Sequence, residues 1–351
     1  MATDTKPMKQ QVSAIDLFCG AGGLSLGLRD SGVIVQAGLD NDPDCQFSYQ
    51  ENIGAKFLLQ DIREVTGDVL SSFFKPDTYR LLAACAPCQP FSGYSLGKGR
   101  TNKDWGLLLE VARLIGEIAP EFVTIENVPR LVHEKIWIDF VGSLEEQGYF
   151  CDWAVLDASK YSVPQSRQRL VLVASKLGPI SLPNPTSDKP ITVRLTIGHL
   201  PSISAGETCV NDEFHCARSL SEKNLARVRA SKQGGTWKDW PKRMRAACHK
   251  RETGATFPSV YGRMSWDKPS PTITTQFYGY GNGRFGHPDQ DRAVSLREGA
   301  LLQSFPLSFC FSSVTQGQIR QIGKLIGNAV PPKLAESIGK AFVDHAATFA
   351  T

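Results

Sequence analysis

The sequence predicts an α/β protein with a doubly wound, Rossmann-like and mostly parallel sheet, joined to a second, smaller and irregular domain. In the first half of the chain, short apolar strands alternate with amphipathic helices, and several strands end at an acidic residue. After residue 177 the chain becomes rich in Pro, Ser, Gly and basic residues and its periodicity weakens. The last segment again has a helical pattern. We therefore expect residues 1–177 and 316–351 to form the larger domain and residues 178–315 to form the smaller one.

The first three strands are predicted at residues 13–18, 33–39 and 57–60. The first strand runs into a glycine-rich turn and then into a helix. The second strand ends at Asp40 and the third ends at Asp61. Because ligands bind at the carboxyl ends of strands in such sheets, these two acidic residues are candidate site residues.

Two further strands are predicted at residues 80–85 and 122–125, with a helix at residues 106–119 between them. The earlier of these strands leads into a proline-rich loop that contains Cys88. The later strand ends at Glu126. Both side chains are therefore expected at the same edge of the sheet as the acidic residues of the earlier strands.

Composition and charge exclude several classes of protein. No apolar stretch reaches the ~18 residues that a membrane span requires, and the N-terminal residues have no apolar segment of a secretory signal. Nine cysteines in such a chain argue for a reducing compartment and for packed or catalytic thiols. We expect a soluble, cytoplasmic protein. The formal net charge of +4 is too small to identify a nucleic-acid partner by itself.

The glycine-rich turn after the first strand suggests a cofactor site. Gly20 and Gly22 would let the backbone approach a nucleotide-like ligand, and Asp40 would accept hydrogen bonds from a ribose. The turn lacks the G-x-x-G tail that is typical of dinucleotide sites. A ligand with adenosine but no phosphate fits better, and S-adenosylmethionine is the obvious candidate. The alternative is a tight strand-to-helix turn without a ligand.

Cys88 lies between Pro87 and Pro90. Proline fixes φ and prevents the loop from continuing the strand, so the thiol would be held open as a nucleophile. A packed sulfur is the alternative, because free cysteine is often buried. Cys85 and Cys88 form a C-x-x-C pair, but the chain contains no second such pair, and we expect no metal site.

Glu126 would emerge from an apolar strand. Burial disfavours the charged form of a carboxyl group, and a protonated glutamate can donate a hydrogen bond to a ring nitrogen of a pyrimidine. The alternative is a helix cap or a surface acid before Pro129. Arg167 and Arg169 lie on one face of an extended segment, where they would hold a carbonyl oxygen and a phosphate, or else form surface ion pairs.

Residues 223–251 form a basic block in which Lys and Arg greatly outnumber acidic residues, with Trp237 and Trp240 between them. Clustered basic residues with interleaved aromatic residues are typical of nucleic-acid binding. The alternative is a solvated basic surface. Arg243 and Arg245 are the candidate nucleic-acid contacts.

Five segments of the chain are DLFCGAGG at 16–23, PCQPFS at 87–92, ENV at 126–128, QSRQR at 165–169 and GNAVPP at 327–332. In this order they resemble the motifs of the cytosine-5 DNA methyltransferase family, of its bacterial or phage type. Residues 292–306 resemble the family's penultimate motif, although Leu301 and Ser304 replace a more usual arginine and glycine. Only about residues 177–266 lie outside the resemblance, where this family has its variable target-recognition region.

The resemblance implies methyl transfer from S-adenosylmethionine to carbon 5 of cytosine. Cys88 would add to carbon 6 of the base, in covalent catalysis that divides one difficult step into two. Glu126 would bind nitrogen 3 and the amino group. Arg169 would bind the carbonyl oxygen, and Arg167 would support the loop. The base that removes the proton from carbon 5 is not identified.

The resemblance also implies DNA and cofactor contacts. A side chain cannot reach carbon 6 of a stacked cytosine, so the base must flip out of the duplex, and Gln89 and Ser92 are placed to contact the gap and the phosphates. Residues 102–106 lack an arginine that is frequent in the family. The positions that match the family's cofactor site are Phe18, Gly20, Gly22, Asp40, Asp61, Ile62, Leu107, Asn328 and Val330.

The implied partner is double-stranded DNA with a specific sequence. The resemblance suggests an enzyme that is paired with a restriction nuclease in restriction-modification or that is solitary. We expect a monomer that does not bind membranes and that acts at the nucleoid of a bacterial cytoplasm. One alternative is an RNA (tRNA) cytosine-5 methyltransferase, but the large segment at 177–266 favours duplex DNA. Another is a catalytically silent DNA-binding module, against which the intact set of Cys88, Glu126 and Arg169 argues.

Overall fold

The computed structural model describes residues 11–87, 106–251, 259–313 and 317–349. The chain divides into two compact units. The first unit comprises Met1–Tyr161, Gln168–Thr186 and Val330–Thr351. The second unit comprises Ser162–Arg167 and Ser187–Ala329.

The boundaries of the second unit differ from those expected for the smaller domain. The second unit includes helix α10, Ile319–Asn328, which the sequence analysis grouped with the larger domain. Close packing explains the difference, because a Cβ atom on Gly327 would lie 2.4 Å from the backbone of Thr274. The helix thus rests directly on a loop of the second unit. The roles expected for the two domains stay predictions.

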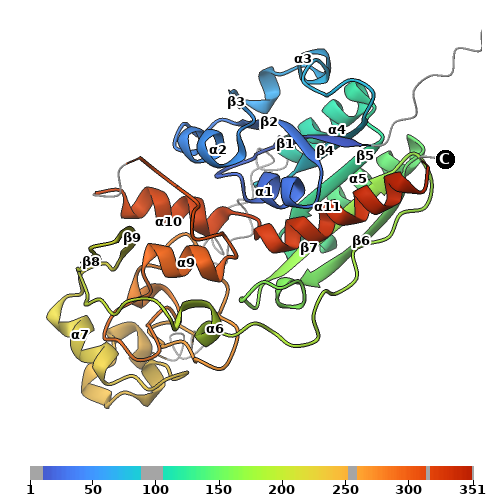
Figure 1. Cartoon of the computed structure of the whole chain (residues 1–351). Coiled ribbons are helices and arrows are strands. Elements are labelled where there is room, and N and C mark those ends of the chain that lie inside the picture. The colour runs from blue at the N-terminus through green and yellow to red at the C-terminus, as the bar shows by residue number, and fades with distance from the viewer. Residues whose placement is uncertain (1–10, 88–105, 252–258, 314–316, 350–351) are drawn as a thin grey trace, which may run out of the picture. The chain divides into compact units, whose positions relative to one another are not determined.

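The first unit is built on a seven-stranded sheet with the order β3-β2-β1-β4-β5-β7-β6 (Figure 1). Strands β1 to β5 run parallel to one another, and β7 runs antiparallel to both β5 and β6. The predicted doubly wound, mostly parallel sheet is therefore confirmed. Because β1 pairs with both β2 and β4, the strand order reverses beside β1, where ligands bind in such folds. The strands are β1 Val12–Leu17, β2 Ile34–Asp40, β3 Lys56–Leu59, β4 Tyr79–Ala84, β5 Phe122–Asn127, β6 Phe150–Asp157 and β7 Gln168–Ser175.

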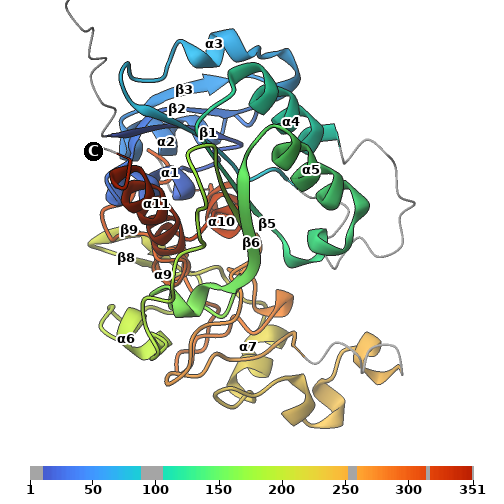
Figure 2. The same cartoon turned by 90° about the vertical axis from the view of Figure 1, so that its right-hand side faces the viewer.

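Helices cover both faces of this sheet, with α4 and α5 on one face and α1 and α11 on the other (Figure 2). The fully buried side chains of Leu17, Val111 and Trp137 belong to the core between the sheet, α4 and α5. On the other face, a Cβ atom on Gly27 of α1 would lie 2.2 Å from the carbonyl oxygen of Pro332 in α11, so these helices pack at backbone contact. The helices and 3₁₀ turns are α1 Gly23–Asp30, α2 Cys45–Ile53, η1 Ile62–Glu64, α3 Gly67–Ser71, α4 Gly106–Ile118, η4 Pro129–His133, α5 Lys135–Glu146, η5 Ala158–Lys160 and α11 Pro332–Ala347.

Within the described residues, every helix is too short or too polar to cross a bilayer. The second unit, which was expected to be irregular, has short elements joined by long loops. Its elements are α6 Val193–Ile197, β8 Thr208–Cys209, β9 Asp212–Cys216, α7 Glu222–Arg229, η6 Trp237–Asp239, η7 Lys242–Met244, η8 Ala247–Lys250, η9 Tyr280–Asn282, α9 Leu296–Leu302 and α10.

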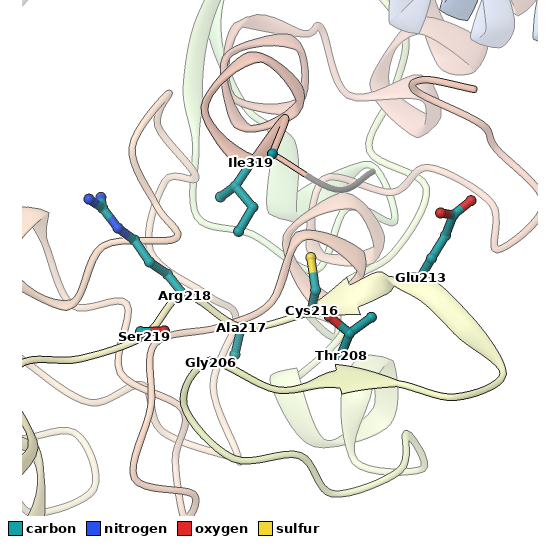
Figure 3. Close-up of a pocket in the computed structure, with 9 residues that line it drawn as sticks. Gly206, Thr208, Glu213, Cys216, Ala217, Arg218, Ser219 and Ile319 are labelled. Carbon is teal, nitrogen blue, oxygen red and sulfur yellow. The ribbon is translucent and has the colours of Figure 1, made fainter. Parts of the chain in front are cut away.

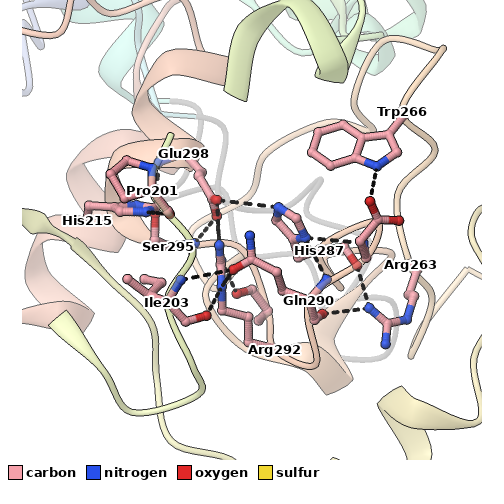
Figure 4. Close-up of polar contacts among 12 residues, drawn as sticks. Pro201, Ile203, His215, Arg263, Trp266, His287, Gln290, Arg292, Ser295 and Glu298 are labelled. Atoms are coloured by element: carbon pink, nitrogen blue, oxygen red, sulfur yellow. Dashed lines mark hydrogen bonds and ion pairs between the residues drawn. The ribbon is translucent and has the colours of Figure 1, made fainter. Parts of the chain in front are cut away.

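Buried arginines organise the loops of the second unit (Figure 4). Arg292 is fully buried and binds both carboxylate oxygens of Glu298 at 2.7 Å. Arg263 donates to the carbonyl oxygens of Val228, Ser231, His287 and Gln290. A chain without regular ladders leaves its carbonyl groups without partners, and a guanidinium group with five donors satisfies several of them at once.

The second unit also has an open pocket of about 670 Å³ beside the β8–β9 hairpin (Figure 3). None of the proposed site residues that the structure describes lines this pocket. Its lining residues are Gly206, Thr208, Glu213, Cys216, Ala217, Arg218, Ser219, Gly317 and Ile319.

Candidate active site

Glu126 is the central residue of the candidate site. The sequence placed it just after a strand, whereas β5 extends two residues further and includes it. All six residues of β5 are buried, and the side chain of Glu126 is 4 % exposed. The neighbouring strand β7 places Val171 opposite Glu126. A carboxyl group is thus held at the end of an apolar strand, at the edge of the sheet where parallel strands present ligand-binding groups.

Two side chains contact the two oxygens of this carboxyl group. Arg169, in β7, places its Nε atom 2.8 Å from Glu126 Oε1. The thiol of Cys85, directly after β4, donates a hydrogen bond to Glu126 Oε2 at 2.8 Å. Among the described residues, no donor makes a well-aligned hydrogen bond to Oε1, so this atom retains capacity for a ligand.

The start of the cysteine loop is tied to the sheet at two points. The backbone N–H of Cys85 donates to the carbonyl oxygen of Leu17 at 3.2 Å, and the side chain of Asn127 donates to the carbonyl oxygen of Ala86 at 3.0 Å. The predicted nucleophile Cys88 and the predicted DNA contacts Gln89 and Ser92 lie outside the described residues.

Arg167 and Arg169 have different partners. Their position on one face of the chain stays a prediction. Arg169 pairs with Glu126 in the first unit, whereas Arg167 belongs to the second unit and is 3 % exposed. Arg167 donates to the carbonyl oxygen of Ile273 at 2.9 Å and contacts those of Gly327 and Ala329 at 3.3 and 3.4 Å. Strand β7 begins at Gln168, so Arg169 belongs to this strand and Arg167 precedes it.

The segment before Val330 is held by a second polar residue that the sequence analysis did not assign. Gln303 is fully buried and donates to the carbonyl oxygens of Ile326 and Ala329 at 3.0 and 2.9 Å. Val330 is buried, and Asn328 is exposed at the end of α10. The sequence signal for Gln303 was a polar residue directly after the apolar end of α9.

The glycine turn has the backbone that a close ligand approach requires. Phe18, Gly20 and Gly22 all have positive φ values, of 58°, 53° and 97°. A Cβ atom on Gly20 would meet no atom of the described residues within 4 Å, so they leave space open beside the turn. The Gly20 N–H donates to Asp40 Oδ2 at 2.9 Å, which fixes this carboxyl group against the turn. Burial raises the pKa of Asp40 above its usual value.

Asp61, Ile62 and Leu107 lie in the same unit as the turn. Asp61 caps η1 and accepts a hydrogen bond from Arg63 Nε at 2.8 Å. These hydrogen bonds from Arg63 lower the pKa of Asp61 to about 2. Ile62 is buried, and Leu107 is half-buried against the core of the first unit. The structure thus gives Asp61 a protein partner, and its predicted cofactor contact stays a prediction.

Asp16 is a further polar residue beneath the turn. It is fully buried in β1, and its Oδ2 atom accepts a hydrogen bond from Ser25 at 2.7 Å. Ser25 is also within 2.9 Å of the hydroxyl of Tyr49. Burial raises the pKa of Asp16 to about 7. Asp16 is a charged residue in a mostly apolar strand. In the sequence it was assigned only as part of the DLFCGAGG motif.

The aromatic residues of the basic block are not on the surface, which corrects their interpretation as part of a nucleic-acid footprint. Trp237 and Trp240 are each 2 % exposed and form a small core with Tyr280. Trp237 stacks on the ring of His249, and Trp240 packs edge-on against Tyr261 while its Nε1 donates to the Ser231 hydroxyl at 2.7 Å. Arg243 is exposed, whereas Arg245 donates to the carbonyl oxygen of Lys238 at 2.7 Å and covers the ring of Trp237.

Metal ligands do not cluster in the part of the chain that the structure describes, where no group of three or more His, Cys, Asp and Glu side chains is arranged to hold an ion. The half-buried Cys85, one member of the C-x-x-C pair, has Glu126 as its hydrogen-bond partner.

Comparison with known proteins gives consistent results. The C-5 cytosine-specific DNA methylase family matches residues 12–344. The chain is 46% identical to the Type II methylase M.HgiDII of Herpetosiphon aurantiacus over 94% of each chain. It is 31% identical to the Type II methyltransferase M1.BsuMI of Bacillus subtilis, over 95% of this chain and 80% of that protein.

Solved structures share the fold. A protein encoded within an E. coli prophage superposes with a TM-score of 0.74 at 23% identity, over 95% of this chain and 99% of that chain. The Dnmt2 methyltransferase of S. pombe superposes with a TM-score of 0.66 at 16% identity, over 95% and 99% of the two chains.

Proposed function

Because this chain belongs to the C-5 cytosine-specific DNA methylase family, we propose that it methylates a flipped cytosine in a specific double-stranded DNA sequence through Cys88, Glu126 and Arg169. The observation that carries these residue roles is the buried pair of Glu126 and Arg169, whose facing atoms lie 2.8 Å apart. A carboxyl group and a guanidinium group at this separation match one edge of a cytosine, which presents a ring nitrogen, an amino group and a carbonyl oxygen.

The proposed chemistry starts at carbon 6 of the base. The thiolate of Cys88 forms a bond to carbon 6 while a proton on Glu126 stabilises the charge that develops at nitrogen 3. Arg169 holds the carbonyl oxygen. Carbon 5 then takes the methyl group, loses its proton to a base, and the bond between Cys88 and carbon 6 breaks as the ring double bond re-forms.

The residues around the glycine turn fit S-adenosylmethionine, which supplies an electrophilic methyl group when bound. The open space beside Gly20 and the positive φ values of the turn allow a ligand to approach the backbone. Asp40 lies at the carboxyl end of β2 with its carboxyl group fixed by the Gly20 N–H, where it would bind hydroxyl groups of the ribose. Phe18, Gly22, Asp61, Ile62, Leu107 and Val330 would complete the pocket, all from the first unit. The cofactor contact of Asn328 rests on the family resemblance alone.

The second unit is proposed to recognise the DNA sequence. Its exposed basic residues include Lys232, Lys238, Lys242, Arg243 and Lys250. Such residues bind phosphates and thereby set the position of the protein on the duplex, while other contacts read the bases. We propose that Arg167 acts indirectly, because its two terminal nitrogens contact backbone carbonyl groups of the second unit.

Base-resolution sequencing of methylated cytosine tests this function. Plasmid DNA is taken from a methylation-free bacterial host that expresses the chain, the Cys88→Ala variant or the Cys151→Ala variant. We expect one short motif to be methylated by the wild type and by Cys151→Ala, which removes a half-buried thiol of β6. Full methylation by Cys88→Ala would refute the role of Cys88. Unmodified DNA with soluble wild-type protein would refute the DNA substrate and would direct the same assay to RNA.

A further inference from the structure

The hydrogen bond between Cys85 and Glu126 is not explained by the roles proposed above. We propose that Cys85 is a positioning residue, whose thiol holds the Glu126 carboxyl group in the orientation that receives the cytosine. This inference rests on the proposed role of Glu126. The thiol donates to Glu126 Oε2 at 2.8 Å, on the side of the carboxyl group opposite the Arg169 contact to Oε1.

The backbone around Cys85 is held tightly enough to perform this role. The Cys85 N–H donates to the carbonyl oxygen of Leu17, which continues the pairing of β4 with β1 one residue past the strand. The next carbonyl group, that of Ala86, accepts from Asn127, the residue that follows Glu126. Strand β4 and strand β5 are therefore connected by two side-chain hydrogen bonds at adjacent positions, and the thiol and the carboxyl group keep a fixed separation.

A thiol suits this position because it is a weak donor. Desolvation and the neighbouring Glu126 raise the pKa of the Cys85 thiol well above its usual range, so it keeps its proton and remains a donor. A carboxyl group with one oxygen unsatisfied and buried would otherwise turn towards other donors. The other oxygen, Oε1, makes no well-aligned hydrogen bond among the described residues and can accept one from the amino group of the base while the thiol stays on Oε2.

The first test compares Cys85→Ala, which removes the donor, with Cys85→Ser, which keeps one. We expect Cys85→Ala to lower the single-turnover rate of methyl transfer about tenfold, with the KM values for DNA and S-adenosylmethionine within twofold of the wild type. Cys85→Ser should restore the rate to within about threefold. The control is Cys151→Ala, because Cys151 Sγ contacts only the Tyr149 carbonyl oxygen at 3.9 Å in the hydrogen bonds of the described residues. A wild-type rate in Cys85→Ala, or an equal loss in Cys85→Ser, would overturn the proposal.

A double-mutant cycle with Glu126→Gln shows whether Cys85 acts through Glu126. If it does, adding Cys85→Ala to Glu126→Gln should change the residual rate less than twofold. A further tenfold loss in the double variant would overturn the positioning role. The proposed function fails separately, because a wild-type rate in Glu126→Gln alone would remove Glu126 from the mechanism. If Cys85→Ala does not fold, the same cycle is made with Cys85→Ser. Any loss of rate that Cys85→Ser causes in the wild type should then be absent in the Glu126→Gln background, and a loss that persists there would overturn the proposal.

Discussion

Glu126 depends on Arg169 because its carboxyl group is buried in a strand that offers it no other cation. Only 15 % of the Arg169 side chain and 4 % of the Glu126 side chain are exposed, so water screens this ion pair weakly. Removal of one partner would leave the other charge buried and uncompensated, which is strongly unfavourable. The planar guanidinium group also offers donors in fixed directions, which a single ammonium group does not.

Arg169→Lys keeps the charge but loses the planar fork, and we expect it to slow single-turnover methyl transfer by roughly ten- to a hundredfold. Lysine cannot contact Glu126 and a cytosine carbonyl oxygen with two fixed donors. Arg194→Lys is the matched control, because the Arg194 pair with Asp267 is exposed and such pairs contribute little. Equal rates for Arg169→Lys and Arg194→Lys would contradict the proposed contact.

Asp16 predicts a pH dependence of stability in the cofactor-free protein. Its folded-state pKa of about 7 lies above the ordinary value of 3.8, so the folded state keeps a proton that the unfolded chain has lost. Stability should therefore fall as the pH rises from about 4 to 7, by up to about 4 kcal/mol at 1.36 kcal/mol per pKa unit.

Asp16→Asn cannot ionise and retains an acceptor for Ser25. We expect its free energy of unfolding, relative to the wild type, to increase steadily between pH 4 and pH 7 and then to level off. Urea unfolding at several pH values measures this difference. If the difference between the two proteins is independent of pH, Asp16 is ionised in the folded state throughout the range.

At the scale of elements, the end of α9 and the end of α10 are joined by one side chain. Gln303 donates to the carbonyl oxygens of Ile326 and Ala329, and Arg167 contacts the latter and that of Gly327. The last carbonyl groups of a helix have no partner within the helix. At the buried end of α10, the side chains of Gln303 and Arg167 provide the donors that water would provide on the surface. The segment that leads to Val330 thus has its position set by two residues distant in sequence.

Gln303→Met preserves the length of the side chain but removes its donor. We expect the free energy of unfolding to fall by about 2 kcal/mol, because buried carbonyl oxygens would lose their partners. Gln147→Leu is the control, since the Gln147 amide donates to Ser143 on the exposed end of α5 and should change stability by no more than about 0.5 kcal/mol. Chemical denaturation compares the two variants. An equally small effect at Gln303 would show that water satisfies these carbonyl groups.

At the scale of the whole molecule, the sequence predicted those features that depend on residues close together in the chain. Short apolar runs located β1 to β5, three of which were expected to end at an acidic residue, and the buried position of Glu126 followed from the strand before it. The placement of β7 between β5 and β6 was not predictable in this way, because it depends on pairing between segments far apart in the chain. The same limit applies to Trp237 and Trp240, since their basic neighbours indicated a surface while the packing of the second unit made them its core.

The electrostatic contribution to DNA binding is a property of the whole molecule. Arg243 and Arg245 were both predicted to contact DNA, but we expect only Arg243 to contribute to this attraction. The net charge is only +4, so a few exposed cations of the second unit must supply much of the attraction to phosphate. Arg243 is exposed, whereas Arg245 supports the aromatic core through Lys238 and Trp237. We expect Arg243→Ala to weaken binding to all duplexes equally, to reduce the slope of log affinity against log salt by about 1, and to leave thermal stability unchanged.

Arg245→Ala should instead lower the free energy of unfolding by about 1 kcal/mol, because a hydrogen bond and a cation–π contact are lost. Fluorescence anisotropy with target and non-target duplexes at about 50 to 200 mM salt measures the first effect, and thermal unfolding measures the second. A loss of affinity in Arg243→Ala that is confined to one base pair of the target would identify Arg243 as a base-reading residue. A reduced salt slope in Arg245→Ala with unchanged stability would mean that its guanidinium group leaves Trp237 to bind a phosphate.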